Sequence, residues 1–491
     1  MNKFKRIIAL MLALFMVVAL SACANDNNGT DTPDAEEQTS ADGTDLEEDE
    51  EEAEEEEADT ESGRVLNIWG WNDEFQGLFE TYFVDAGHLP EDVEVNFTIV
   101  PSDDNAYQNA LDEALLSQES ASDDEKIDLF LVEADYALKY VNSDYTLDII
   151  NDVGLTEDDI AGQYTYTQEI VTDSNGAIKG TSWQATPGLF AYRRSIAEDV
   201  LGTDEPAEVQ EALSTWDGFY EVAEMASDNG YKMLSGYDDS YRTFSNNVSS
   251  PWVDSDNTIQ IDDNIFTWIE QTKEFTDQDY NNGTSLWDDQ WAADQGPDGE
   301  VFGFFYSTWG INFTLLGNAL DTPLPEGVTA TGDPEAFREA TEDNGIFGDY
   351  GVVEGPQNYY WGGSWLCAAA GSDNLDLVQE IMRTMTTDKE TLSTITQDTQ
   401  DFTNNTEAME ELAADDDFES AFLGGQNHIA LFAESAQGID MSNISPYDQG
   451  LNEEIQTAFR DYFNGNVDYD TALNNFYTAA VEKYPDLNIP D

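Results

Sequence analysis

The chain has 491 residues, and its 104 acidic side chains against 17 basic ones give a net charge of −87 at pH 7. A field of this sign and strength repels nucleic acids and other polyanions, so nucleic-acid binding is excluded. With only two cysteines and two histidines, the sequence has no Cys/His cluster of zinc-site spacing, and cysteine-protease chemistry is disfavoured as well.

The N-terminus has the order of a secretory signal peptide: basic residues first, then 14 apolar residues at 7–20, then small residues before Cys23. A membrane-spanning helix needs about 20 apolar residues, so a permanent span is the less favoured alternative. Residues 20–23 resemble the lipobox of bacterial lipoproteins. This resemblance implies that residues 1–22 are removed and that Cys23 carries lipid, which places the protein at the extracellular face of the cell membrane. A non-lipidated signal with a chance cysteine is the alternative.

The segment after the cysteine is acidic and of low complexity. Residues 24–63 contain two long acidic runs and neither Lys nor Arg. Such a segment repels itself and has little apolar surface to bury, so we expect residues 23–63 to be a lipidated, disordered tether. The remaining 428 residues exceed what one hydrophobic core usually supports, and two lobes are therefore predicted.

Strand and helix patterns alternate at the start of this folded region. In the strands apolar residues form short runs or alternate with polar ones, whereas in the helices they recur every three or four residues. Strands are predicted at residues 65–69, 93–99 and 127–132, and helices at 75–83, 107–115 and 134–141. This order is typical of a parallel sheet with helices on its faces.

Ligands of such sheets bind beyond the carboxyl ends of the strands. Trp71, Asn72 and Asp73 follow the first predicted strand, and Glu133 and Asp135 follow the third. Polar and aromatic groups therefore cluster where a ligand is expected.

The later part of the chain is predicted to be rich in helices. Thr215 is placed to cap a helix that ends at Asn229 and Gly230. Two further apolar stripes of helical period, at residues 451–463 and 473–480, predict a pair of C-terminal helices.

A set of weak motifs also occurs in a fixed order along the chain, at residues 65–72, 178–194, 302–310, 350–356, 361–368, 374–385 and 402–405. In this order they resemble the extracellular solute-binding proteins of ABC importers, in the carbohydrate-binding group that includes maltose-binding protein. Residues 192–194 read Tyr-Arg-Arg where that family usually has Tyr-Asn-Lys, a mild departure outside the expected cleft.

The resemblance implies an α/β, two-lobed, periplasmic-binding-protein-like fold. Each lobe would hold a mostly parallel sheet flanked by helices, and three hinge segments would cross between the lobes. Residues 64–188 and 362–402 would form lobe I, and residues 189–361 and 403–491 lobe II. The implied function is the extracellular substrate-binding component of an ABC importer, which captures a neutral sugar or oligosaccharide and delivers it to the permease. We expect a monomer with no cofactor and no metal site. Acidic patches such as residues 415–417 could hold calcium loosely, although a solvated surface is the favoured alternative.

A sugar offers apolar C–H faces and a rim of hydroxyls, so its site needs flat aromatic rings together with carboxylates or amides. The alternative to ligand contact for each aromatic candidate is a role in packing or in the hinge. The alternative for each polar candidate is a solvated position on the surface. Trp309 and Trp361 are the strongest candidates. The predicted ligand-binding residues are Trp71, Asn72, Asp73, Glu133, Asp135, Trp183, Gln184, Trp309, Trp361 and Trp365.

The sequence lacks a nucleophile elbow, a P-loop or a dinucleotide-binding turn at a strand-to-helix junction, so we predict no catalytic residue and no enzyme. A surface glycosidase and a non-transport carbohydrate-binding adhesin are the alternative functions. The scarcity of basic residues favours a neutral solute over an anion, and a cationic solute such as a polyamine stays open.

Overall fold

The computed structural model of the chain describes residues 65–325 and 327–490. The predicted signal peptide, Cys23 and the acidic tether lie outside the described residues.

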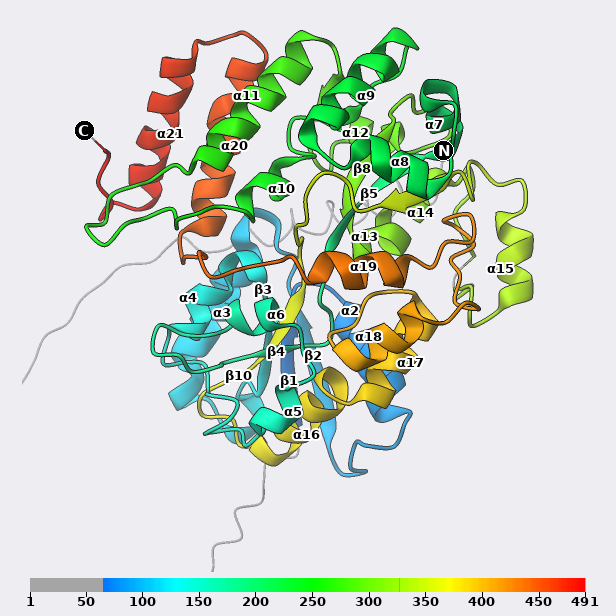
Figure 1. Cartoon of the computed structure of the whole chain (residues 1–491). Coiled ribbons are helices and arrows are strands. Elements are labelled where there is room, and N and C mark those ends of the chain that lie inside the picture. The colour runs from blue at the N-terminus through cyan, green and yellow to red at the C-terminus, as the bar shows by residue number, and fades with distance from the viewer. Residues whose placement is uncertain (1–64, 326, 491) are drawn as a thin grey trace, which may run out of the picture. The chain divides into compact units, whose positions relative to one another are not determined.

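The first sheet has five strands. β1 runs parallel to β2 and β3, with Val65 opposite Glu94 and Ile68 opposite Leu129. β10 comes from much later in the chain and pairs antiparallel with β3 and β4, and Figure 1 shows this yellow strand among the blue and cyan ones. In sheet order the strands are β2 (Glu94–Ile99), β1 (Val65–Gly70), β3 (Leu129–Glu133), β10 (Ser364–Ala368) and β4 (Thr181–Ser182).

Helices accompany this sheet, and together they are called the first lobe. Its three early strands and their helices confirm the alternating pattern of the sequence, and β3 is buried on both faces, as the central strand of a covered sheet should be. The first helix continues as a π-helical turn, Glu80–Val84. The helices are α2 (Glu74–Phe79), α3 (Ala106–Ser117), α4 (Ala137–Val141), α5 (Glu157–Ile160), α6 (Thr165–Glu169), α16 (Leu375–Thr386) and α17 (Lys389–Thr399).

The second lobe contains a three-stranded sheet and a two-stranded one. β5 lies between β8 and β9 and is antiparallel to both, whereas β6 and β7 are parallel. The expectation of a mostly parallel sheet is therefore wrong for the larger sheet of this lobe. The strands are β8 (Gly303–Ser307), β5 (Gly188–Arg193) and β9 (Tyr350–Val353) in one sheet, and β6 (Leu234–Gly236) and β7 (Asn281–Thr284) in the other.

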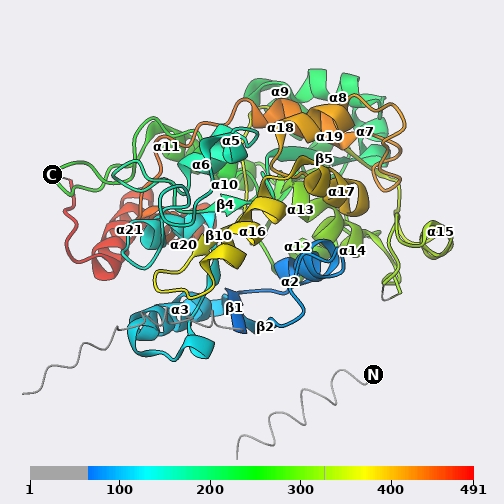
Figure 2. The same ribbon diagram turned by 90° about the horizontal axis from the view of Figure 1, so that it is seen from below.

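The second lobe is rich in helices, as predicted. The Thr215 hydroxyl accepts a hydrogen bond from Gly218 N and caps α9, and the two C-terminal helices pack side by side with α11 (Figure 1 and Figure 2). Its helices before β10 are α7 (Arg194–Leu201), α8 (Pro206–Leu213), α9 (Trp216–Asp228), α10 (Tyr241–Ser245), α11 (Asp263–Asp277), α12 (Asp289–Asp294), α13 (Thr308–Gly310), α14 (Leu316–Ala319) and α15 (Pro334–Thr341), with a π-helical turn at Ile311–Leu315. The last part of the chain adds α18 (Thr406–Ala413), which packs against α17 and α19, then α19 (His428–Ala436), α20 (Asp448–Phe463) and α21 (Tyr469–Lys483).

Three segments cross between the lobes, and they lie next to one another. Residues 183–188 are in the middle. On one side Gly188 N donates to Tyr359 O (2.7 Å) and on the other Asn404 N donates to Trp183 O (2.8 Å). These crossing segments are buried, with Thr186 and Asn404 fully shielded from solvent.

The crossings explain the strand directions. β3 ends at Glu133 opposite Ser364, the first residue of β10, and β8 ends at Ser307 opposite Gly188, the first residue of β5. Because β5 and β10 enter their sheets directly from a crossing, they run against neighbours that end there. Apolar periodicity indicates that a strand exists but not its direction, so the sequence pattern could not supply this detail.

Candidate functional site

The strand ends of both lobes meet at the crossings, and we call this region the seam. The carboxyl ends of β3 and β8 lie there, together with the amino ends of β5 and β10. Side chains just beyond these strands can therefore reach the opposite lobe, which is the position the sequence analysis expected for a ligand.

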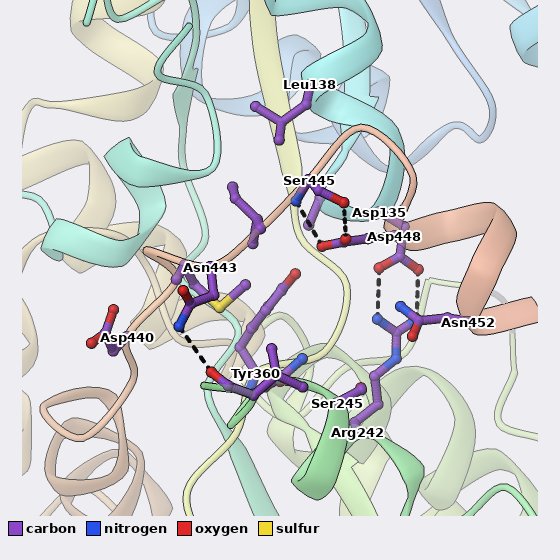
Figure 3. A pocket seen from close by; sticks show the side chains of 15 residues that line it. Asp135, Leu138, Arg242, Ser245, Tyr360, Asp440, Asn443, Ser445, Asp448 and Asn452 are labelled. Atoms are coloured by element: carbon purple, nitrogen blue, oxygen red, sulfur yellow. Dashed lines mark hydrogen bonds and ion pairs between the residues drawn. The ribbon is translucent and has the colours of Figure 1, made fainter. Parts of the chain in front are cut away.

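One part of the seam is a polar pocket, shown in Figure 3. It is lined by Asp135 of the first lobe, by Arg242 and Asp448 of the second lobe and by Tyr360 of a crossing segment. Its cavity of about 30 Å³ has room for only a few water molecules. A sugar does not fit there as the lobes now stand, so this part of the seam is closed.

An ion pair spans the polar pocket. Arg242 Nη1 and Nη2 donate to the two carboxylate oxygens of Asp135, each at 2.6 Å. Both side chains are about one-fifth exposed. Asp135, a predicted ligand contact, thus already has a bidentate partner from the other lobe.

Two more carboxyl groups lie close to this ion pair. Burial and the neighbouring Asp135 charge raise the pKa of Glu133 to about 7, although Arg242 opposes the shift. Burial likewise raises the pKa of Asp448 to about 7, although Ser445 donates to its carboxylate through both the backbone amide and the hydroxyl. Near neutral pH these groups exist partly as acids and can both donate and accept hydrogen bonds.

The other part of the seam is aromatic. Trp309, just after β8, donates from Nε1 to the carbonyl of Trp361 (2.9 Å), and the two ring centroids are 5.2 Å apart at 74°. Trp361 stacks on Tyr306, with centroids 6.0 Å apart at 23°. The structure therefore brings the two strongest aromatic candidates together, and Trp309 remains partly exposed. Gly362 permits this arrangement, because a Cβ at that position would lie 2.8 Å from Trp309 Nε1.

Polar groups from the first lobe and a crossing lie near this aromatic part. Gln184 Nε2 donates to Glu74 Oε1 (2.8 Å). Burial, then the charge of Asp401, raise the pKa of Glu74 to about 7. Burial also raises the pKa of Asp401 to about 6. Asp401 interacts electrostatically with Glu74 and lies near Thr308, the residue before Trp309, so the carboxyl groups lie close to the aromatic residues.

The turn after β1 is less enclosed. Trp71 is partly buried and meets the rings of Tyr107 and Tyr136 edge-on, with centroids 5.7 Å and 6.2 Å away. Asn72 and Asp73 are exposed, and Asn72 Oδ1 accepts from Glu74 N (3.2 Å). This turn positions Glu74 at the start of α2.

Two of the predicted tryptophans pack inside the protein. Trp183 and Trp365 are each 1% exposed. Trp183 packs against Phe75 at a centroid distance of 5.1 Å, and Trp365 Nε1 donates to Thr167 O (2.8 Å). In this structure neither has a face open to a solute.

Sequence reasoning missed Glu74, Arg242 and Trp287. Glu74 follows the Trp71 turn directly, so extending the strand-end argument by one residue would have included it. No local signal distinguishes Arg242 from the other basic residues, because its role depends on contact with the opposite lobe. Trp287, in the loop before α12, adds a third indole 6.2 Å from that of Trp309.

Among residues 65–325 and 327–490, no group of three or more His, Cys, Asp or Glu side chains is arranged to hold a metal ion. Within the same ranges, no helix has the length and apolar character needed to cross a membrane.

The family model described as "Bacterial extracellular solute-binding protein" matches residues 88–421. No curated protein matches the sequence significantly.

Many solved structures are similar to this chain at low sequence identity, among them the following three. An extracellular solute-binding protein of family 1 has a TM-score of 0.66 and 16% identity, covering 85% of this chain and 99% of its own. The ABC transporter associated binding protein from B. animalis subsp. lactis Bl-04, in complex with beta-1,6-galactobiose, has a TM-score of 0.61 and 16% identity. The match covers 87% of this chain and 100% of that protein. The sugar-binding protein MalE from Xanthomonas citri has a TM-score of 0.62 and 12% identity. The match covers 85% of this chain and 98% of that protein. These likenesses confirm the two-lobed α/β fold.

Proposed function

Since the chain belongs to the family of bacterial extracellular solute-binding proteins, we propose that it captures a neutral sugar or oligosaccharide between its lobes and delivers it to the transmembrane subunits of an ABC importer. Proteins of similar fold were solved with beta-1,6-galactobiose and with lacto-N-biose. At 16% identity these neighbours support the class of solute and not a particular sugar.

The observation that carries this proposal is the proximity of indoles and hydrogen-bonding carboxyl groups at the seam. Trp309 offers partly exposed ring surface and packs on Trp361, which is 7% exposed as the lobes stand. From the other side Glu74 offers a partly exposed carboxyl group, held by the buried Gln184. A saccharide needs this combination, because its ring faces are apolar and its edge carries hydroxyls. The seam residues that we assign to the solute are Trp71, Asn72, Asp73, Glu74, Glu133, Asp135, Gln184, Trp309 and Trp361.

The charge of the seam argues for a neutral solute. Arg242, the basic side chain of the polar pocket, is already paired with Asp135. An anionic sugar would have to compete with that carboxylate, and it would also meet Glu133 and Asp448. Neutral sugar hydroxyls avoid this repulsion, and they can both donate hydrogen bonds to partly protonated carboxyl groups and accept hydrogen bonds from them.

The three adjacent crossings support a hinge mechanism. We assign residues 64–188 and 362–402 to one rigid lobe, and residues 189–361 and 403–491 to the other. A solute that contacts both lobes stabilises the closed form, and the permease then recognises a closed surface. Because such capture needs no covalent chemistry, we assign the protein no catalytic residue.

The membrane attachment is a separate part of the proposal. Lipid on Cys23 would hold the protein at the extracellular face of the membrane, and the acidic tether would let the folded region reach the permease. The basis is the sequence order of residues 1–63.

The test combines thermal unfolding with product analysis, using neutral mono- and oligosaccharides, sugar acids and polyamines. A neutral saccharide should raise the melting temperature without being cleaved. At a concentration 100 times its Kd, it should increase the free energy of unfolding by about 2.7 kcal/mol. Steady release of cleaved sugar would support the glycosidase, and a response to polyamines alone would overturn the neutral-sugar assignment. A bound saccharide without stimulated uptake in a strain that carries the importer would favour the adhesin.

Trp309→Ala should abolish the saccharide-dependent shift. Trp216→Ala is the matched control, because Trp216 is also a partly buried indole of the second lobe but stacks on Phe244, with centroids 4.7 Å apart. If both variants keep the ligand response, the site assignment is wrong.

A further inference from the structure

Two aromatic side chains beside Trp309 are largely exposed. Trp287 is 58% exposed and Phe313 is 80% exposed. The Trp287 ring is 6.2 Å from that of Trp309 at 21°, and the Phe313 ring is 6.5 Å from it at 60°. Single exposed apolar residues are ordinary on a protein surface, but two exposed rings against the partly exposed indole of Trp309 form a continuous aromatic surface.

The backbone holds Trp287 in this position at a cost in free energy. Its φ is +72°, a left-handed conformation that bulky residues rarely adopt. The surrounding turn is closed by Ser285 N donating to Asp288 Oδ2 (3.0 Å) and by Asp288 N donating to Ser285 O (3.1 Å). Strain of this kind is costly and is concentrated at functional positions. Because the Trp287 side chain is exposed, the strain is not compensated by burial of its indole.

Phe313 is also presented by an unusual backbone segment. It lies in the π-helical turn Ile311–Leu315, directly after α13. Such turns are rare and are often found at functional sites. The neighbouring Asn312 donates from Nδ2 to Thr399 O of the first lobe (3.3 Å), so this turn lies at the seam.

We propose that Trp287 and Phe313 bind further units of a saccharide chain, so that the solute is an oligosaccharide rather than a single sugar. This inference rests on the proposed function and specifies the length of the solute. One pyranose ring stacked on Trp309 cannot also cover both neighbouring rings, whereas a chain of linked units can. Exposed Asp288, Asp289 and Gln290 beside Trp287 supply acceptors for the hydroxyls of such units.

The experiment measures affinity against chain length. Titration calorimetry uses two series, glucose to maltotetraose and galactose to beta-1,6-linked galactotriose, with the wild type, Trp287→Ala and Phe313→Ala. In the series that binds, Trp287→Ala should weaken binding of the trisaccharide about tenfold, equivalent to about 1.4 kcal/mol, and change binding of the monosaccharide less than about threefold. Phe313→Ala should show the same dependence on length, and Trp287→Phe should restore most of the affinity.

Tyr145→Ala is the matched control, because Tyr145 is an exposed aromatic residue of the first lobe, 37% exposed. It should leave every affinity unchanged. Melting temperatures of all variants establish that they fold, and Trp287→Gly should be at least as stable as the wild type because glycine removes the strain.

Equal losses for the monosaccharide and the trisaccharide, or no loss for either, would overturn the inference while leaving the proposed function intact. If no saccharide of any length or linkage binds the wild type, the proposed function fails and the inference fails with it.

Discussion

Asp135 and Arg242 connect the two lobes through a bidentate ion pair, with both N···O distances at 2.6 Å. Asp135 lies just beyond β3 of the first lobe, and Arg242 belongs to α10 of the second. The pair spans a pocket too small for a sugar and joins the two lobes there. In the proposed hinge mechanism, this contact has to break before a solute enters.

Asp135→Asn should shift the ligand-free protein towards an open form. The pair is one-fifth exposed, so its loss should cost the closed form about 1–2 kcal/mol, between the values of surface and buried pairs. Small-angle X-ray scattering should show a larger radius of gyration. Lys232→Ala, which breaks an ion pair of 2.6 Å with Asp279 inside the second lobe, should leave the scattering unchanged. Identical curves for all three proteins would show that the pair does not control opening.

Stability should fall as the pH rises from about 5 to 8. The pKa of Glu74, of Glu133 and of Asp448 is raised to about 7, mainly by burial. In this window the folded chain binds more protons than the unfolded chain, so the free energy of unfolding decreases with rising pH. Melting temperatures at closely spaced pH values should decline most steeply between about pH 5 and 7.

Glu74→Gln should flatten that decline, because the amide keeps an acceptor for Gln184 but does not titrate in this range. The exposed Glu482→Gln is the control and should follow the wild-type curve. A melting temperature that rises steadily from pH 5 to 8 would contradict the burial of these carboxyl groups.

Trp365 should contribute to stability through packing. Trp365→Ala removes a fully buried indole and its hydrogen bond to Thr167, and should lower the free energy of unfolding by roughly 3–5 kcal/mol in denaturant titrations. Leu116→Ala, at a side chain 69% exposed, should change it by less than about 0.5 kcal/mol. If Trp365→Phe keeps the unfolding midpoint but loses the saccharide response, Trp365 is a ligand contact instead.

Cys23→Ser should release the protein from the membrane, because lipid can no longer be attached. Cell fractionation and mass spectrometry of the mature N-terminus provide the measurement. Cys367→Ala is the control for loss of a cysteine, since Cys367 is buried and burial raises the pKa of its thiol. Equal membrane fractions for Cys23→Ser and the wild type would contradict anchoring through Cys23.

The sequence predicted much of the fold because local patterns reflect local structure. The first three strands, the cap at Thr215 and the C-terminal helices are found where periodicity and capping chemistry placed them. The direction of β5 could not be predicted from these patterns, because it depends on the end from which the chain enters the sheet.

The candidate site was predictable only in part. Trp309 and Trp361 could be selected because they lie in glycine-flanked turns, and they meet in the structure. Trp365 has the same kind of local sequence, yet it is sealed inside the protein. Residue type and turn context indicate what a side chain can bind, but not which face of it stays open.

The sequence by itself determined the chemistry that this protein can offer, which is abundant indoles and carboxylates with few basic groups, together with the order of strands and helices. Tertiary structure alone decided that Asp135 is paired with Arg242, that Glu74 titrates near neutral pH, and that Trp287 is exposed beside Trp309. The physical reason is that each of these properties depends on atoms distant in the chain, which only the packing of the lobes brings into contact.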